Sequence, residues 1–121
     1  MLWTVDPAAE EPLYAQLVAQ VHLALARGEL GPGDRLPAAR ELAASLEVNV
    51  HTVLHAYQQL RDDGVLELRR GRGAVVVQGA GTAGRDLSAV ERALAAFVDA
   101  ARGAGLPPEA TTTLLKEALK G

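Results

Sequence analysis

The pattern that decides the fold lies in residues 49–78, NVHTVLHAYQQLRDDGVLELRRGRGAVVVQ. Asn49 is a favourable helix N-cap, and Gly64, which follows two aspartates, is a typical helix stop. Between them the apolar residues recur at helical spacing, which predicts an inward face made of Val53, Ala56, Tyr57 and Leu60. The β-prone runs 65–69 and 74–78 flank a short glycine-containing turn and therefore predict a hairpin.

Two further helices are predicted upstream of this stretch. The first runs from Leu13 to a stop at Arg27-Gly28, and its apolar stripe consists of Leu13, Leu17, Val18, Val21 and Leu25. A turn-rich connector leads to a second helix from about Pro37 to Leu46. Residues 47–49 then form a tight turn, and residues 1–5 form a short strand or an extended arm.

Three short helices followed by a hairpin describe a winged helix-turn-helix, a mainly α fold with a small β-hairpin. We assign this domain to residues 1–78. Residues 79–84 are small and glycine-rich and predict a linker, and residues 85–121 form a helical tail. Gly103-Ala104-Gly105 divides this tail into two helices.

The two tail helices are amphipathic, and neither can hide its apolar face alone. We therefore expect a two-helix dimerisation tail that docks on a second copy of the chain. Its apolar positions are Leu87, Val90, Leu94, Phe97, Val98, Leu114, Leu115 and Leu119.

Composition narrows the class of protein. The chain has 121 residues, of which 49% are hydrophobic and 3% aromatic, a balance that favours helical packing. It has no cysteine, which excludes disulfides and thiolate zinc sites. No apolar run reaches the ~20 residues that span a bilayer, and the first residues do not resemble a secretory signal. We expect a cytoplasmic protein without membrane contact.

Charge alone leaves the partner open. The net charge is −3, yet the segment from Arg35 to Gln78 holds six arginines and five acidic residues. Averages of this kind hide local patches. Arg35 and Arg40 flank the second predicted helix, where they either pair with Asp34 and Glu41 or point toward a nucleic-acid backbone.

The outer face of the helix that follows Asn49 is polar. At about 100° per residue, His51 and His55 point away from the inward face, and Thr52 lies on the flank. Histidine can hydrogen-bond base edges and threonine can bind a phosphate, although a polar outer face is ordinary on any surface helix. The two histidines could also share a metal ion, but zinc normally needs three or four protein ligands, so we predict no metal site.

The turn of the hairpin is basic. Gly71 and Gly73 permit positive φ and close approach of the backbone to a phosphate, and Arg72 between them can reach a minor groove. The alternative is a plain turn whose arginines keep an edge strand soluble.

A resemblance to a known family is carried by PLYAQL (12–17), GELGPGDRLPAARELA (28–43) and VNVHTVLHAY (48–57), followed by the Gly71-Arg72-Gly73 turn. These segments resemble the DNA-binding domain of the GntR family of bacterial regulators. The short tail is similar to that of the YtrA-like subfamily, whose tails dimerise and are too small for the usual effector domain. The resemblance implies a repressor that binds an inverted-repeat operator as a homodimer and controls a neighbouring operon.

Position by position, the resemblance implies DNA contacts at Arg35, Ala38, Arg40, Asn49, His51, Thr52, His55, Gly71, Arg72 and Gly73. Family members often carry serine at the position of Ala38 and basic residues at the positions of Leu54 and His55. These departures remove phosphate ligands, so we expect weaker or more salt-sensitive binding, or a different sequence preference.

Two other classes compete with this interpretation. The acidic net charge and the outward Leu54 favour a winged-helix module that binds a protein partner and no DNA. An enzyme is the weakest option, because the sequence has no nucleophile–base pair, phosphate loop or carboxylate cluster near a histidine. We expect no cofactor, and no pocket-forming domain follows the linker to suggest a small-molecule effector.

Overall fold

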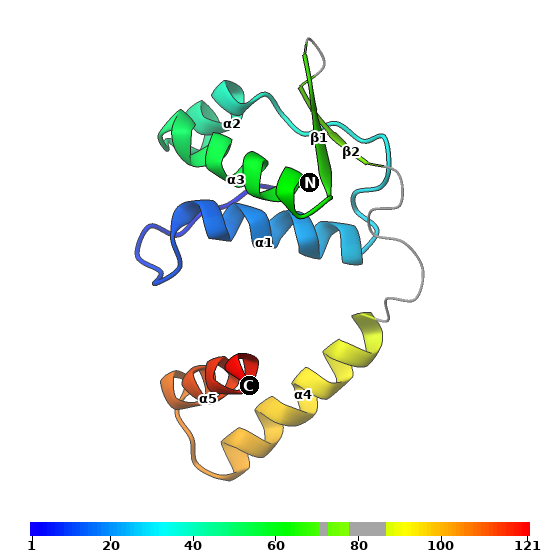
Figure 1. Cartoon of the computed structure of the whole chain (residues 1–121). Coiled ribbons are helices and arrows are strands. Elements are labelled where there is room, and N and C mark those ends of the chain that lie inside the picture. The colour runs from blue at the N-terminus through cyan, green and yellow to red at the C-terminus, as the bar shows by residue number, and fades with distance from the viewer. Residues whose placement is uncertain (71–72, 78–86) are drawn as a thin grey trace. The chain divides into compact units, whose positions relative to one another are not determined.

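The computed structural model describes residues 1–70, 73–77 and 87–121, and the chain divides into two compact units, residues 1–85 and 86–121 (Figure 1). The elements of the first unit are α1 (Leu13–Ala26), α2 (Ala39–Leu46), α3 (Val50–Asp62), β1 (Leu66–Arg69) and β2 (Gly73–Val76). The second unit contains α4 (Leu87–Gly103) and α5 (Pro108–Lys120). The predicted fold class is confirmed. The predicted linker 79–84 lies outside the described residues.

The helix ends follow local sequence signals. Gly28, with φ 77°, ends α1 as predicted, and the Asn49 side chain caps α3 by accepting a hydrogen bond from the His51 amide at 2.8 Å. Glu47, between α2 and α3, has φ 57°, a left-handed conformation that costs a residue with a side chain roughly 1–2 kcal/mol. The turn between these two helices is held by a hydrogen bond from the Val48 amide to the Ala43 carbonyl at 3.0 Å and by the packing of Leu46 and Val48 against the core cluster.

The second helix begins later than predicted. We expected it from Pro37, whereas α2 begins at Ala39. The preceding residues are held in the sheet, because the Leu36 amide donates to the Ala74 carbonyl at 2.9 Å. The Tyr57 hydroxyl also donates to the Pro37 carbonyl at 2.6 Å. Both hydrogen bonds keep this segment extended up to the start of α2.

The hairpin has a third, short partner that the sequence did not indicate. β1 and β2 are antiparallel with Leu66 opposite Val76. Arg35 forms an isolated antiparallel bridge to Val75, flanked by a hydrogen bond from the Val76 amide to the Asp34 carbonyl at 2.8 Å. Part of the predicted connector therefore pairs with the edge of the wing, which is the hairpin formed by β1 and β2.

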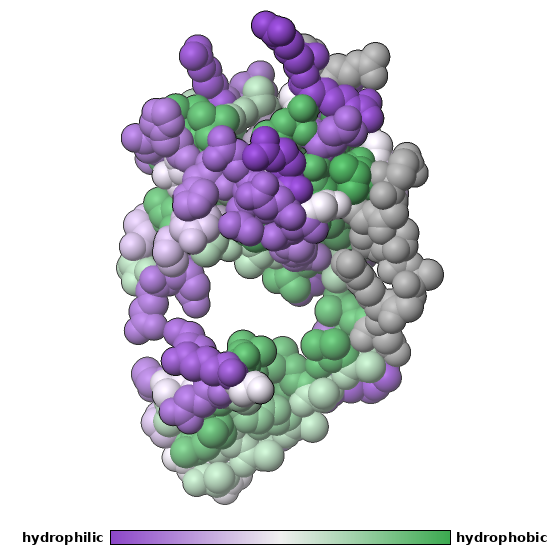
Figure 2. Space-filling model, in the orientation of Figure 1, coloured by the Kyte–Doolittle hydropathy of each residue, from purple (hydrophilic) through white to green (hydrophobic). Residues whose placement is uncertain are grey.

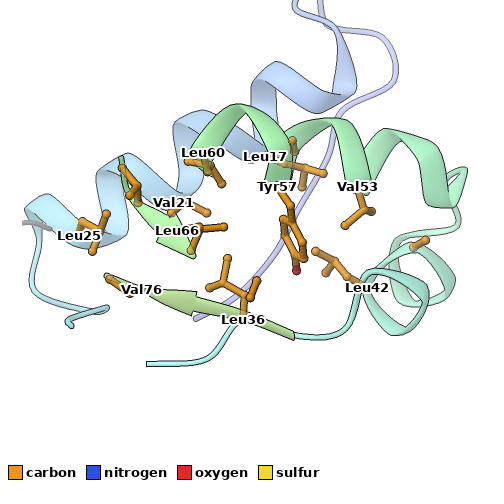
Figure 3. Packing of buried hydrophobic residues seen from close by; sticks show 14 residues of the cluster. Leu17, Val21, Leu25, Leu36, Leu42, Val53, Tyr57, Leu60, Leu66 and Val76 are labelled. Carbon is orange, nitrogen blue, oxygen red and sulfur yellow. The ribbon is translucent and has the colours of Figure 1, made fainter. Parts of the chain in front are cut away.

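The core of the first unit lies around α3, which contacts α1, α2 and β1. The side chains labelled in Figure 3 converge from all three helices and both strands. The largest of the fully buried ones are Leu17, Val21, Val53, Leu60 and Val76. Tyr57 is also buried, which raises the pKa of its hydroxyl above the ordinary value. All four residues of the predicted inward face of α3 are buried.

The first residues form an extended arm, one of the two predicted alternatives. The Gln20 side chain bonds both the amide and the carbonyl of Thr4, and the Gln16 side chain bonds those of Asp6. This pairing turns Trp3 and Val5 against the core cluster, where they are half-buried. The arm is thus part of the folded first unit.

The second unit is a helical hairpin with little interior of its own. Ala101 is its single buried residue among those described, and Gly105, with φ 79°, reverses the chain between α4 and α5 as predicted. Hydrophobic residues gather along α4 in Figure 2. Large apolar side chains remain exposed at Val90, Leu94, Leu114, Leu115 and Leu119. Within the described part of the chain, no helix combines the length and hydrophobicity needed to cross a membrane.

Candidate nucleic-acid interface

A groove of about 410 Å³ runs between the start of α1 and the first half of α3. Its α1 side is formed by Pro12, Leu13 and Tyr14. Its α3 side consists of the N-cap Asn49 and of His51, Thr52 and His55 in the helix, for all four of which the family resemblance implied a DNA contact. The fold therefore brings these four together on one open surface.

Among the described residues, none forms a hydrogen bond with the side chains of His51, Thr52 or His55 in this groove. The Oδ1 atom of Asn49 is engaged in the cap of α3, which leaves its side-chain NH₂ as the group that can reach outward. His51 and His55 are exposed and Thr52 is half-buried. A polar surface of this kind can hydrogen-bond base edges and phosphates.

His55 is held by an aromatic neighbour. The rings of Tyr14 and His55 stack with centroids 3.8 Å apart and planes 20° apart. Tyr14 is not among the predicted DNA contacts, because its spacing to Leu17, Val18 and Val21 is typical of a core residue. It in fact packs at the edge of the core with part of its surface open to the groove.

A second cluster lies at the hairpin. A hollow of about 390 Å³ is lined by the charged residues Arg35, Glu67 and Arg69 together with Gly33 and residues 75–77. The Arg69 guanidinium donates to the Glu67 carboxylate at 2.9 Å, and this hydrogen bond lowers the pKa of Glu67 and raises that of Arg69. Both side chains are therefore charged at neutral pH, and Glu67 offsets part of the positive charge of the hollow.

The remaining predicted contacts are distributed around these two clusters. Ala38 and Arg40 are exposed at the start of α2. Within the described residues no carboxylate lies within 4.0 Å of Arg35 or Arg40, so the predicted alternative of pairing with Asp34 and Glu41 is not observed. Gly73 begins β2 with φ 72°, the positive value predicted for it. Gly71 and Arg72 lie outside the described residues.

The two histidines of α3 gain no metal partners in the structure. Over residues 1–70, 73–77 and 87–121, there is no group of three or more histidine, aspartate and glutamate side chains that could hold an ion. His22, the other histidine of the chain, faces Asp63 at 3.1 Å instead. Its hydrogen bond, with a second one from Gln59, lowers the pKa of Asp63.

A polar helix held outward on two supporting helices, next to a basic hairpin, defines a winged helix-turn-helix DNA-binding module. The sequence profile of bacterial regulatory proteins of the gntR family matches residues 13–76, from the start of α1 to the end of β2. The chain belongs to the GntR family of bacterial regulatory proteins and is a DNA-binding transcription regulator.

Two curated relatives from Bacillus subtilis are similar in sequence. The transcriptional repressor YtrA is 38% identical over 78 residues, which cover 64% of this chain and 60% of YtrA. The regulator YhcF is 37% identical over 70 residues, covering 58% of each protein. The chain thus matches about three fifths of the length of these relatives.

Two solved structures extend the comparison. YtrA from Sulfolobus acidocaldarius, a GntR-family transcription factor, is 30% identical with a TM-score of 0.59, and the match covers 98% of this chain and 97% of that one. The DNA-binding domain of AraR in complex with operator ORX1 is 25% identical with a TM-score of 0.54, covering 63% of this chain and all of that domain. The first match includes the tail, and the second is a protein bound to its operator.

Proposed function

We propose that the protein is a cytoplasmic repressor that binds an inverted-repeat operator as a homodimer. The observation that carries the proposal is the exposure of five large apolar side chains in the tail, from 40% at Leu115 to 77% at Leu119. Apolar faces of this kind mark a protein interface. A second copy of the tail is the partner of matching chemistry, and repression is the role named for YtrA of Bacillus subtilis.

Two-fold symmetry determines the form of the operator. A symmetric dimer presents two copies of α3 to the DNA, so its half-sites are inverted and lie about one helical turn, or a multiple of it, apart. We assign the base-reading role to Asn49, His51, Thr52 and His55. The backbone contacts fall to Arg35, Ala38, Arg40 and the Gly71-Arg72-Gly73 turn.

A selection of bound sequences from random DNA tests this proposal, followed by footprinting on the selected site. We expect an inverted repeat with two protected half-sites. Protection of one asymmetric half-site would count against the dimeric repressor. No binding even at low salt, where non-specific binding is strongest, would remove DNA as the partner.

Replacing Arg72 by alanine is expected to weaken binding to all sequences and to flatten its salt dependence. Each lost phosphate contact lowers the slope of log affinity against log salt by about 0.9. Fluorescence anisotropy at several salt concentrations measures this slope. Arg92→Ala, which removes the same charge from α4, is the matched control and should leave the slope unchanged. An unchanged slope for Arg72→Ala would exclude a phosphate contact by this residue.

Replacing Glu67 by glutamine is expected to have the opposite effect. It removes the carboxylate that engages Arg69, so the Arg69 guanidinium becomes available to phosphates beside Arg35, which Glu67 does not engage. Affinity should rise several-fold, and the slope should steepen by up to about 0.9 for one additional contact. Glu29→Gln, an equal change of charge in the turn that follows α1, controls for net charge. Equal effects of the two substitutions would show that only net charge matters.

A further inference from the structure

We propose that Tyr14 is a positioning residue of DNA recognition, which holds His55 in the orientation that reads one base pair of each half-site. The proposal rests on the proposed use of α3 as the base-reading helix. It adds α1, a supporting element, to the parts of the fold that determine sequence preference.

The stacked geometry of Tyr14 and His55 restrains the histidine. The two rings are 3.8 Å apart and within 20° of parallel, so one face of the imidazole is covered by the phenol ring. Tyr14 itself is anchored, because it is half-buried against the core cluster in the first turn of α1. His55 would otherwise be a solvent-exposed side chain on the outer face of α3 with freely exchanging rotamers.

The stacked imidazole of His55 keeps its hydrogen-bonding capacity. Stacking occupies a face of the imidazole and leaves its edge, which carries both nitrogens, free. No described residue provides a hydrogen-bond partner for these nitrogens or for the Tyr14 hydroxyl, and both side chains line the open groove beside His51 and Thr52. An unpaired nitrogen at a fixed position suits the acceptors or donors of a base edge.

Restraining His55 before binding lowers the entropic cost of base recognition. Fixing a mobile side chain on binding costs conformational entropy, and a side chain that is already fixed avoids this cost. It also discriminates better, because a hydrogen bond of fixed direction penalises a wrong base. Tyr14 thus contributes to specificity without touching the base itself.

The experiment compares Tyr14→Ala, Tyr14→Phe and His55→Ala in the full chain by selection of bound sequences and by titration of the wild-type operator. We expect Tyr14→Ala and His55→Ala to lose preference at the same base pair of each half-site, with operator affinity about tenfold lower. Tyr14→Phe keeps the aromatic ring and should retain both the base preference and the operator affinity. The double alanine variant should bind no worse than either single variant.

Three outcomes would overturn the proposal. In the first, Tyr14→Ala melts at a lower temperature but selects the wild-type sequence. In the second, His55→Ala leaves every base preference intact, a test that does not depend on the core contact of Tyr14. In the third, Tyr14→Phe behaves like Tyr14→Ala, which would assign the hydroxyl to a phosphate instead. Absence of any inverted repeat in the wild-type selection would instead contradict the dimeric operator of the proposed function.

Discussion

Replacing Leu94 by glutamate is expected to lower operator affinity by about 10²–10⁴-fold, the range by which linking two binding modules strengthens binding. Leu94 lies on the exposed apolar face of α4 with 49% of its surface accessible. A carboxylate at this position would have to be desolvated in the dimer without a partner. We therefore expect monomers, each of which can occupy only one half-site.

Ala96→Glu is the matched control for this substitution. It adds the same charge to the same helix, but residue 96 lies about 200° around the helix from residue 94, on the side away from the apolar face. Ala96 is exposed, so a longer side chain is accommodated there. This variant should remain dimeric and bind the operator like the wild-type chain.

Sedimentation velocity and titration of a single half-site complete the test. Leu94→Glu should sediment as a monomer and bind the isolated half-site as well as the wild-type chain does, because α3 and the wing are unchanged. A variant that stays dimeric would place the interface elsewhere. A monomer with unaltered affinity for the full operator would show that the two half-sites are bound independently.

Much of the fold could be predicted because the signals are local. The helical spacing of Val53, Ala56 and Leu60 defined the inward face of α3, and Asn49 marked its first turn. Glycines at positive φ, such as Gly28 and Gly105, ended helices where the sequence indicated. Each of these features depends on residues within one or two helical turns, and for that reason a single sequence contains them.

The differences arise where distant residues decide. The start of α2 was predicted two residues early because the Tyr57 hydroxyl and the Ala74 carbonyl, both remote in sequence, hold residues 36 and 37 extended. The pairing of Arg35 with Val75 was missed for the same reason. Glycine- and proline-rich connectors carry no periodicity from which a strand could be inferred.

For the site, the sequence indicated which residues face outward but not how they are supported. His51 and His55 follow from the face opposite the core, whereas the stack of Tyr14 on His55 depends on how α1 crosses α3. The charge balance of the wing hollow likewise depends on pairing across the sheet, which places Arg35, Val75 and Glu67 in one row. Tertiary geometry thus determines which of several polar residues act together.

Replacing Leu60 by alanine is expected to destabilise the DNA-binding unit by about 2–5 kcal/mol, the cost of a buried leucine truncation that leaves a cavity. Leu60 is 0% exposed and belongs to the core cluster around α3. The loss is a large share of the roughly 5–15 kcal/mol by which natural domains are stable. DNA binding should fail at temperatures where the wild-type chain still binds.

Leu54 on the same helix provides the matched control, because it is 39% exposed and lies outside the core cluster. Leu54→Ala should change stability by no more than about 0.5 kcal/mol.

Trp3, the only tryptophan of the chain, packs against the core, so its fluorescence during urea unfolding reports on this unit alone. Protein concentration must be equal in both titrations, since dimerisation adds to apparent stability. Equal midpoints for the two variants would contradict the central place of α3 in the core. A change confined to Leu60→Ala would separate the buried face of this helix, which supports the fold, from the exposed face that we propose for DNA binding.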